Sequence, residues 1–177
     1  LDIIASSNWT RPIYFAVTVG PEAFIGLERY FQIEGLTYRL VPYAPMRDQP
    51  RIDTDIMYDN LMNKAKWGGL DKNEVWMDEN NLRMASTMRM QMRTLATSLI
   101  QEGKKDKALE VLKKCMEVLP ERNVPFYDPC PLNYSYYLAQ TFYLADGKEE
   151  AVKLSNRLFD IIEGDVEYVV SVRKSEP

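Results

Sequence analysis

Two aspartates placed one residue apart come closest to a chemical motif in this sequence. Asp53 and Asp55 match the D-x-D pattern that holds a metal ion and a sugar nucleotide in some enzymes. The same residues suit a helix start, where Asp53 would accept a backbone hydrogen bond and Asp55 would face the helix dipole. A longer calcium loop through Asp59 is excluded, because Tyr58 stands where the turn needs glycine and Lys64 where a bidentate glutamate belongs. We therefore favour the helix cap and expect no metal site.

Other catalytic groups are sparse. The chain has no histidine, no G-x-S-x-G motif and no glycine-rich phosphate loop. Its two cysteines, Cys115 and Cys130, cannot form a structural zinc site without histidines. A disulfide between them is left open, since pairing depends on geometry. We predict no catalytic residue and no cofactor in this chain.

The composition is that of a globular protein without a nucleic-acid surface. Of 177 residues, 46% are apolar and 27% are charged, and the formal net charge is −4. Basic residues are interleaved with acidic ones, which argues against nucleic acid as a partner. The longest apolar run, residues 13–19, is far shorter than the roughly 20 residues of a membrane helix.

A repeated spacing of small residues indicates the architecture. Ala96 and Ala108 are twelve residues apart, and so are Ala139 and Ala151, each pair in a similar setting of leucines and a glycine. This is the tetratricopeptide pattern, in which two antiparallel helices meet closely through small residues. We predict a mainly α fold of tetratricopeptide-like helical hairpins over residues 78–177.

Helix boundaries in this half follow from caps and periodicity. Asp78 caps a helix to about residue 102, and further helices are predicted over 105–119 and 132–144. Asp146 and Glu149 resemble a capping box for a fourth helix that ends near Glu163. Gly164 is expected to have positive φ, and residues 165–172 to form a last helix that covers the exposed end.

The remaining residues, 1–77, are predicted to form a small α+β element. Residues 13–19 read as a buried strand, 25–31 as a short helix and 36–42 as an edge strand that ends in proline. Asp53 would cap a helix to about Lys66, with its apolar side chains toward the core: Ile56, Leu61 and Ala65.

The concave groove of the helical hairpins is the candidate binding site. By spacing, the first helix of each pair places an arginine, tyrosines and amide side chains there, which suit an extended peptide or a carbohydrate. The alternative is an ordinary solvated face. The predicted groove residues are Met90, Arg93, Thr97, Asn133, Tyr136, Gln140 and Tyr143.

Four methionines crowd the first helix of this half: Met84, Met88, Met90 and Met92. They could form an adaptable surface for a partner or fill an irregular core. We favour the core, because an apolar stripe on a helix is usually buried.

Several motifs resemble the soluble C-terminal region of a family of multi-span bacterial membrane proteins of unknown function. They are residues 8–16 (NWTRPIYFA), 35–42 (GLTYRLVP), 66–69 (KWGG) and 77–80 (MDEN), with Arg83-Met84 behind. That family is similar to glycosyltransferases of the GT-C, protein O-mannosyltransferase type. The first residue is leucine, and residues 1–5 read like the tail of a helix, so we expect a fragment of a longer protein.

The resemblance implies a parent with an N-terminal bundle of membrane helices and a lipid-linked sugar donor. Its acidic catalytic residue would lie on a loop of that bundle, outside this chain, and no catalytic residue of the family maps here. The chain would be a tethered tail on the extracytoplasmic (periplasmic) face, one that does not itself span the membrane.

Three functions follow as hypotheses. The first is a non-catalytic accessory domain that binds acceptor polypeptide, glycan or a partner subunit. The second is a structural module that packs on its own membrane-embedded domain without a ligand, and it predicts exposed apolar area on the N-terminal half. The third is an enzyme that uses Asp53 and Asp55 with a metal ion.

Overall fold

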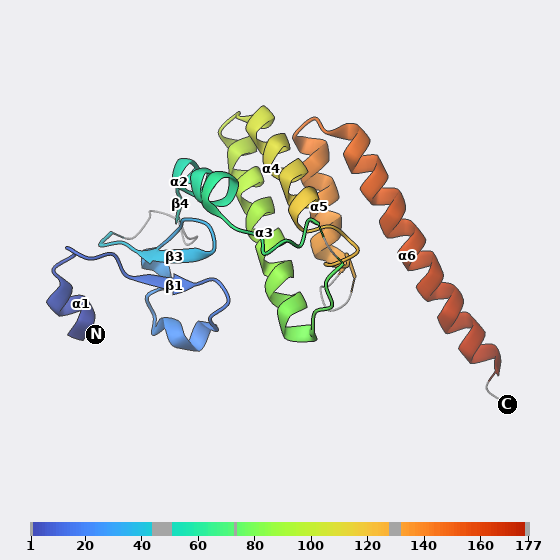
Figure 1. Cartoon of the computed structure of the whole chain (residues 1–177), viewed down its shortest axis with the longest axis horizontal. Helices are drawn as coiled ribbons and strands as arrows, with labels where there is room; N and C mark the ends of the chain where they lie inside the picture. Colours follow the sequence, from blue (N-terminus) through green and yellow to red (C-terminus); the bar gives the residue numbers. More distant parts are fainter. Residues whose placement is uncertain (1, 44–50, 73, 128–131, 176–177) are drawn as a thin grey trace.

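The computed structural model describes residues 2–43, 51–72, 74–127 and 132–175. A small sheet lies at the N-terminal end, beside stacked helices (Figure 1). The predicted fold class, mainly helical with hairpins and a small N-terminal α+β element, is confirmed. In chain order the elements are α1 (Asp2–Ser7), β1 (Tyr14–Ala16), η1 (Pro21–Phe24), η2 (Glu28–Tyr30), β2 (Phe31–Ile33), β3 (Thr37–Leu40), β4 (Arg51–Ile52), α2 (Thr54–Tyr58), η3 (Asp59–Lys64), α3 (Glu79–Gln101), α4 (Lys105–Val118), α5 (Leu132–Leu144) and α6 (Lys148–Ser175).

The strand order in the sheet is β1-β3-β2-β4, so β3 is interior and β1 lies at one end. β3 pairs antiparallel with β1 and with β2, while β4 runs parallel to β2. We predicted the first strand as buried, which is wrong, because Tyr14 of β1 is 47% exposed. We predicted the strand within 36–42 as an edge, which is also wrong, because β3 has a neighbouring strand on each side. Pro42, which indicated an edge, lies beyond the end of β3 and removes no hydrogen bond from the ladder.

The predicted helix over residues 25–31 is also wrong. Ile25 and Gly26 have positive φ angles of 49° and 78°, which an α-helix cannot contain. Two short 3₁₀ turns, η1 and η2, flank this break, and the chain then enters the buried strand β2. Phe31 of β2 packs edge-to-face on Phe24, with ring centroids 5.0 Å apart.

Helix α2 ties the sheet to the helices. As predicted, Asp53 caps it, accepting a hydrogen bond from the backbone N–H of Ile56 at 3.1 Å. The Thr54 hydroxyl donates to the carboxylate of Glu102, which follows α3, at 2.9 Å. The Tyr58 hydroxyl donates to Glu110 of α4 at 2.7 Å, and this bond raises the pKa of Tyr58 to about 12.

The core is continuous between the two parts of the chain. Met57 and Leu61 are buried and join Ile33 of β2 to the cluster formed by the long helices. Of the side chains predicted to face this core, Leu61 does so, whereas Ala65 is half-buried and Ile56 is exposed. In α2 the buried apolar residue is Met57, one position after the predicted Ile56. The division of the chain at residue 77 stays a prediction.

The long helices form two hairpins, α3 with α4 and α5 with α6, and α5 also packs on α3. All four alanines that defined the repeat spacing are buried: Ala96, Ala108, Ala139 and Ala151. Gly103 turns the first hairpin with φ at +77°. The prediction of helical hairpins with these alanines in the core is therefore confirmed.

The predicted capping box at Asp146 and Glu149 is wrong. Asp146 has a φ of +65° and donates its backbone N–H to the carbonyl of Tyr143 at 3.1 Å, so it closes α5 and does not open α6. Its side chain accepts a hydrogen bond from Lys105 at 2.9 Å, which lowers the pKa of Asp146 and links the turns of the two hairpins.

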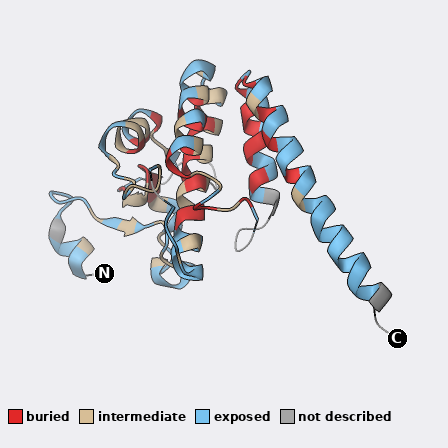
Figure 2. Ribbon diagram, turned by 45° about the vertical axis from the view of Figure 1, so that its right-hand side comes forward, coloured by how far each residue is buried: buried red, intermediate tan, exposed pale blue. Residues whose placement is uncertain are grey.

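Helix α6 is one continuous helix of 28 residues. We predicted an end near Glu163, positive φ at Gly164 and a separate helix over 165–172, and the structure contradicts all three. A glycine weakens a helix but ends it only where the backbone turns. Figure 2 shows buried positions only in the first part of α6, because the 13-residue α5 covers less than half of its length. None of the helices in the described ranges has the length and apolarity needed to cross a membrane.

A buried arginine holds the connector between α4 and α5. The guanidinium of Arg89 donates to the carbonyl oxygens of Leu119 at 2.8 Å and Pro125 at 3.1 Å, and also to that of Val124. It stacks on the ring of Phe126, 4.8 Å from its centroid. One side chain thus satisfies several acceptors of irregular backbone, which would otherwise be buried without donors.

Replacing this arginine tests its role in stability. Arg89→Met keeps an apolar stem but leaves buried carbonyls unsatisfied, so we expect the free energy of unfolding in urea to fall by about 3 kcal/mol. Arg83→Met is the control, because Arg83 is exposed and its pair with Glu79 contributes about 0.5 kcal/mol or less. An equal fall in the free energy of unfolding in both variants would contradict the stabilising role of Arg89.

The continuity of α6 has its own test. We expect Gly164→Ala to stabilise the helix by about 0.5–1 kcal/mol, seen as slower hydrogen exchange around residue 164. Gly103→Ala should have the opposite effect on the first hairpin, because Gly103 has positive φ. Faster exchange in Gly164→Ala would mean that α6 ends at Gly164.

Candidate functional site

Exposed tyrosines line one face of α5. Tyr136 and Tyr143 are 57% and 59% exposed, and Gln140 lies between them on the same side of the helix. Tyr137 is also exposed and packs edge-to-face against Tyr136, with ring centroids 5.5 Å apart. The predicted residues Tyr136, Gln140 and Tyr143 are therefore accessible together.

Arg93 of α3 meets this row from the neighbouring helix. Its guanidinium lies over the ring of Tyr137, 5.5 Å from the centroid. Burial lowers the pKa of Arg93, while Tyr137 and Tyr134 act in the opposite direction. Its Nε is buried and has no hydrogen-bond partner among the described residues. We call Arg93, Tyr136, Tyr137, Gln140 and Tyr143 the tyrosine face.

The other predicted groove residues contribute less. The Thr97 hydroxyl donates to the backbone carbonyl of Arg93 at 3.0 Å, so it is used within α3. Met90 is half-buried beside Arg93 and Tyr134. The side chain of Asn133 lies outside the described part of the structure, and its placement in the groove stays a prediction.

The methionines of α3 divide between core and surface. Met92 is fully buried and Met88 packs on the core, which confirms core filling for these two. Met84 is exposed, so the same interpretation is wrong for it. Cys115 lies on the buried face of α4 as a free thiol, and burial raises its pKa to about 11. Cys130 lies outside the described residues.

The two aspartates of the D-x-D motif do not converge on a shared site. Asp53 caps α2, and Asp55 forms an ion pair with Lys104 at 3.6 Å. Within the described ranges, no group of three histidine, cysteine, aspartate or glutamate side chains could hold a metal ion. The favoured interpretation of Asp53 as a helix cap is confirmed.

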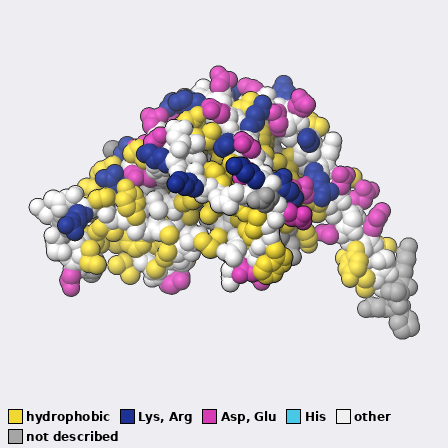
Figure 3. All heavy atoms as spheres, in the orientation of Figure 1, with side chains coloured by type: hydrophobic (Ala, Val, Ile, Leu, Met, Phe, Trp, Pro, Cys, Tyr) yellow, Lys and Arg dark blue, Asp and Glu magenta, His cyan; other side chains and the backbone are white. Residues whose placement is uncertain are grey.

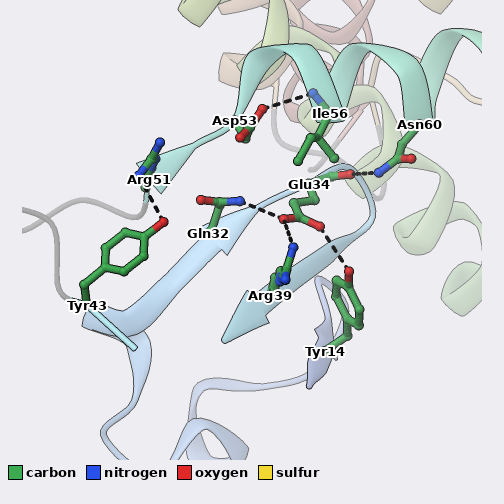
Figure 4. Close-up of polar contacts among 9 residues, drawn as sticks. All are labelled: Tyr14, Gln32, Glu34, Arg39, Tyr43, Arg51, Asp53, Ile56 and Asn60. Atoms are coloured by element: carbon green, nitrogen blue, oxygen red, sulfur yellow. Dashed lines mark hydrogen bonds and ion pairs between the residues drawn. The ribbon is translucent and has the colours of Figure 1, made fainter. Parts of the chain in front are cut away.

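A second polar site lies in the sheet and was not predicted. The buried carboxylate of Glu34 accepts hydrogen bonds from Gln32 at 2.7 Å and Tyr14 at 3.2 Å, and pairs with Arg39 at 3.4 Å (Figure 4). Its backbone carbonyl accepts a hydrogen bond from Asn60 at 2.6 Å. One carboxylate thus fixes side chains from three strands or their ends.

A pocket of about 300 Å³ lies beside this network. The Leu40 N–H donates to the Ile13 carbonyl at 2.9 Å, so residues 9–12, before β1, run alongside residues 40–43, after β3. This pairing brings together the side chains that we call the arginine pocket: Trp9, Arg11, Gln32, Arg39 and Tyr43. Most of them lie in the motifs 8–16 and 35–42, but only the strand register shows that the two segments are neighbours.

Comparison with known families gives a partial match at the N-terminal end of the chain. Residues 1–56 match the model of TMEM260-associated domain 2, a family named after a membrane protein. The match includes the sheet and the arginine pocket and stops within α2. No curated protein and no solved structure shows a significant match to the chain.

Proposed function

We propose that this chain is a non-catalytic interaction domain of a membrane glycosyltransferase and that it binds acceptor polypeptide through the tyrosine face. The observation that carries the proposal is the row of exposed tyrosines on α5, which meets a half-buried arginine from α3. Tyrosine and arginine are the side chains most enriched at binding hot spots, because they combine large contact area with polar groups.

The shape of this face favours an extended chain. Tyr136 and Tyr143 are separated by about 10 Å along the helix axis, since an α-helix rises about 1.5 Å per residue. Gln140, between them, offers both a donor and an acceptor to a peptide backbone. A glycan or a partner subunit would use the same stacking and hydrogen-bonding groups, and we place these second to polypeptide.

The link to a membrane enzyme is supported by the N-terminal match. TMEM260 is an O-mannosyltransferase-like membrane protein. The sequence motifs resemble a family that is similar to the same type of glycosyltransferase. The proposed extracytoplasmic (periplasmic) location follows from that resemblance, in which the soluble tail meets acceptor proteins on the outer side of the membrane.

Removal of the tyrosine rings tests the binding face. Peptides selected from a displayed random library against the wild-type chain should bind the double variant Tyr136→Ala, Tyr143→Ala about tenfold more weakly or worse, because two stacking surfaces are lost. Tyr168→Ala is the matched control, since Tyr168 is even more exposed, at 70%, but lies on the uncovered part of α6. The melting temperature should hardly change in any of these variants.

Either of two binding results would contradict the proposal. One is that no peptide is selected, and the other is that the selected peptides bind the double variant as well as the wild type. Loss of folding in the double variant would also show that these tyrosines belong to the core and not to a binding face.

A structural module without a ligand is the second candidate, and one observation favours it. Large apolar side chains are exposed toward the N-terminal half, including Ile3 (74%), Ile25 (61%) and Trp76 (87%). Figure 3 shows hydrophobic side chains spread over the sheet end of the molecule. An apolar area of this kind is typical of a surface that packs on another domain.

Charged substitutions at this end test the second candidate. In the intact membrane protein, Ile3→Asp with Ile25→Asp should loosen the chain from the membrane part, seen as faster protease cleavage between the two, because buried carboxylates are costly. Val152→Asp, an exposed site on α6, is the control. Unchanged cleavage would leave the tyrosine face as the better explanation.

A further inference from the structure

The charge of the arginine pocket points to an anionic ligand. Two of the side chains that line it, Arg11 and Arg39, are positively charged, and none of the lining residues that the structure describes is acidic. Arg51 adds a third positive charge nearby, because it lies 5.6 Å from the centroid of the Tyr43 ring and donates to the Tyr43 hydroxyl at 3.1 Å. Guanidinium groups bind phosphate and carboxylate oxygens through paired hydrogen bonds.

Arg39, which lines the pocket, is held in place before any ligand binds. Arg39 contacts Glu34 through one Nη at 3.4 Å, while its side chain stays 41% exposed. Glu34 is buried and already accepts hydrogen bonds from Gln32 and Tyr14, so it orients Arg39 without filling the pocket. A donor fixed in this way loses little freedom when a ligand binds.

Two aromatic side chains also belong to the pocket. Trp9 and Tyr43 line it and are 46% and 47% exposed. Trp9 and the preceding Asn8 both have positive φ, of 59° and 44°, a backbone conformation that costs energy in residues other than glycine. The backbone is thus strained at Trp9, whose indole ring lines the same pocket as Arg11 and Arg39.

We propose that the arginine pocket binds a small phosphorylated carbohydrate. Arg11 and Arg39 bind the phosphate oxygens, and the sugar ring stacks on Trp9 or Tyr43. The amide oxygen of Gln32 accepts a hydrogen bond from a sugar hydroxyl, since its Nε2 already donates to Glu34. A volume of about 300 Å³ is at the lower end for ligand sites, which suits a monosaccharide phosphate. This site is separate from the tyrosine face and does not depend on its function.

Calorimetry on the whole chain at low salt tests the proposal, with glucose 1-phosphate as the probe. We expect saturable binding that weakens about tenfold or more in Arg11→Gln and in Trp9→Ala, and that falls as salt is raised. Arg29→Gln is the matched control and should bind normally, since Arg29 is exposed and stacks on Tyr30 outside the pocket. Arg11 is exposed, so Arg11→Gln decides the outcome even if Trp9→Ala fails to fold.

Two further titrations separate the parts of the ligand. Inorganic phosphate and methyl glucoside should each bind at least about tenfold more weakly than glucose 1-phosphate, because each supplies only one half of the contacts. The proposal is overturned if glucose 1-phosphate shows no saturable binding, if Arg11→Gln binds it as well as the wild type, or if inorganic phosphate binds equally tightly. None of these results bears on peptide binding at the tyrosine face.

Discussion

Close contact between helices at alanine positions is the constraint on which the rest of the structure depends. Ala96 and Ala108 are fully buried where α3 meets α4, and Ala139 and Ala151 are buried where α5 meets α6. A larger side chain at these points would push the helices apart, because protein interiors are packed without spare volume. The close approach lets Leu95, Leu99 and other leucines form one core, and it sets the side of α5 that remains outside.

The sheet depends on this helical core through α2. Thr54 and Tyr58 reach acceptors after α3 and on α4, and Met57 and Leu61 enter the same apolar cluster. Both proposed sites are products of this arrangement. The tyrosine face is what the hairpins leave uncovered, and the arginine pocket is lined by residues of the sheet that α2 anchors.

Much of the helical part could be predicted from the sequence, because its signals are local. Asp53 and Asp78 cap helices as predicted, and the twelve-residue alanine spacing marks the helix contacts. The predictions of helix ends were wrong where a residue type is compatible with two backbone conformations. Asp146 could open α6 or close α5, and Gly164 could end a helix or lie within one, and only the surrounding backbone decides between them.

The candidate sites divide in the same way. Tyr136, Gln140 and Tyr143 share a face by helical periodicity alone, so their common exposure could be predicted. The arginine pocket could not, because Trp9 and Arg39 are distant in the chain and meet only through the register of β1 and β3. Non-local pairing of short strands leaves no periodic signal in a sequence.

The dependence of α2 on later residues has a consequence for the order of folding. Hairpins of neighbouring helices form from local contacts and fold quickly, whereas β1 and β3 are joined across a long separation. Glu102 and Glu110, which accept the hydrogen bonds of α2, are synthesised after the whole sheet. The sheet is therefore synthesised before the helices on which α2 depends, and until α3 and α4 exist the side chains of Met57 and Leu61 lack the core that buries them.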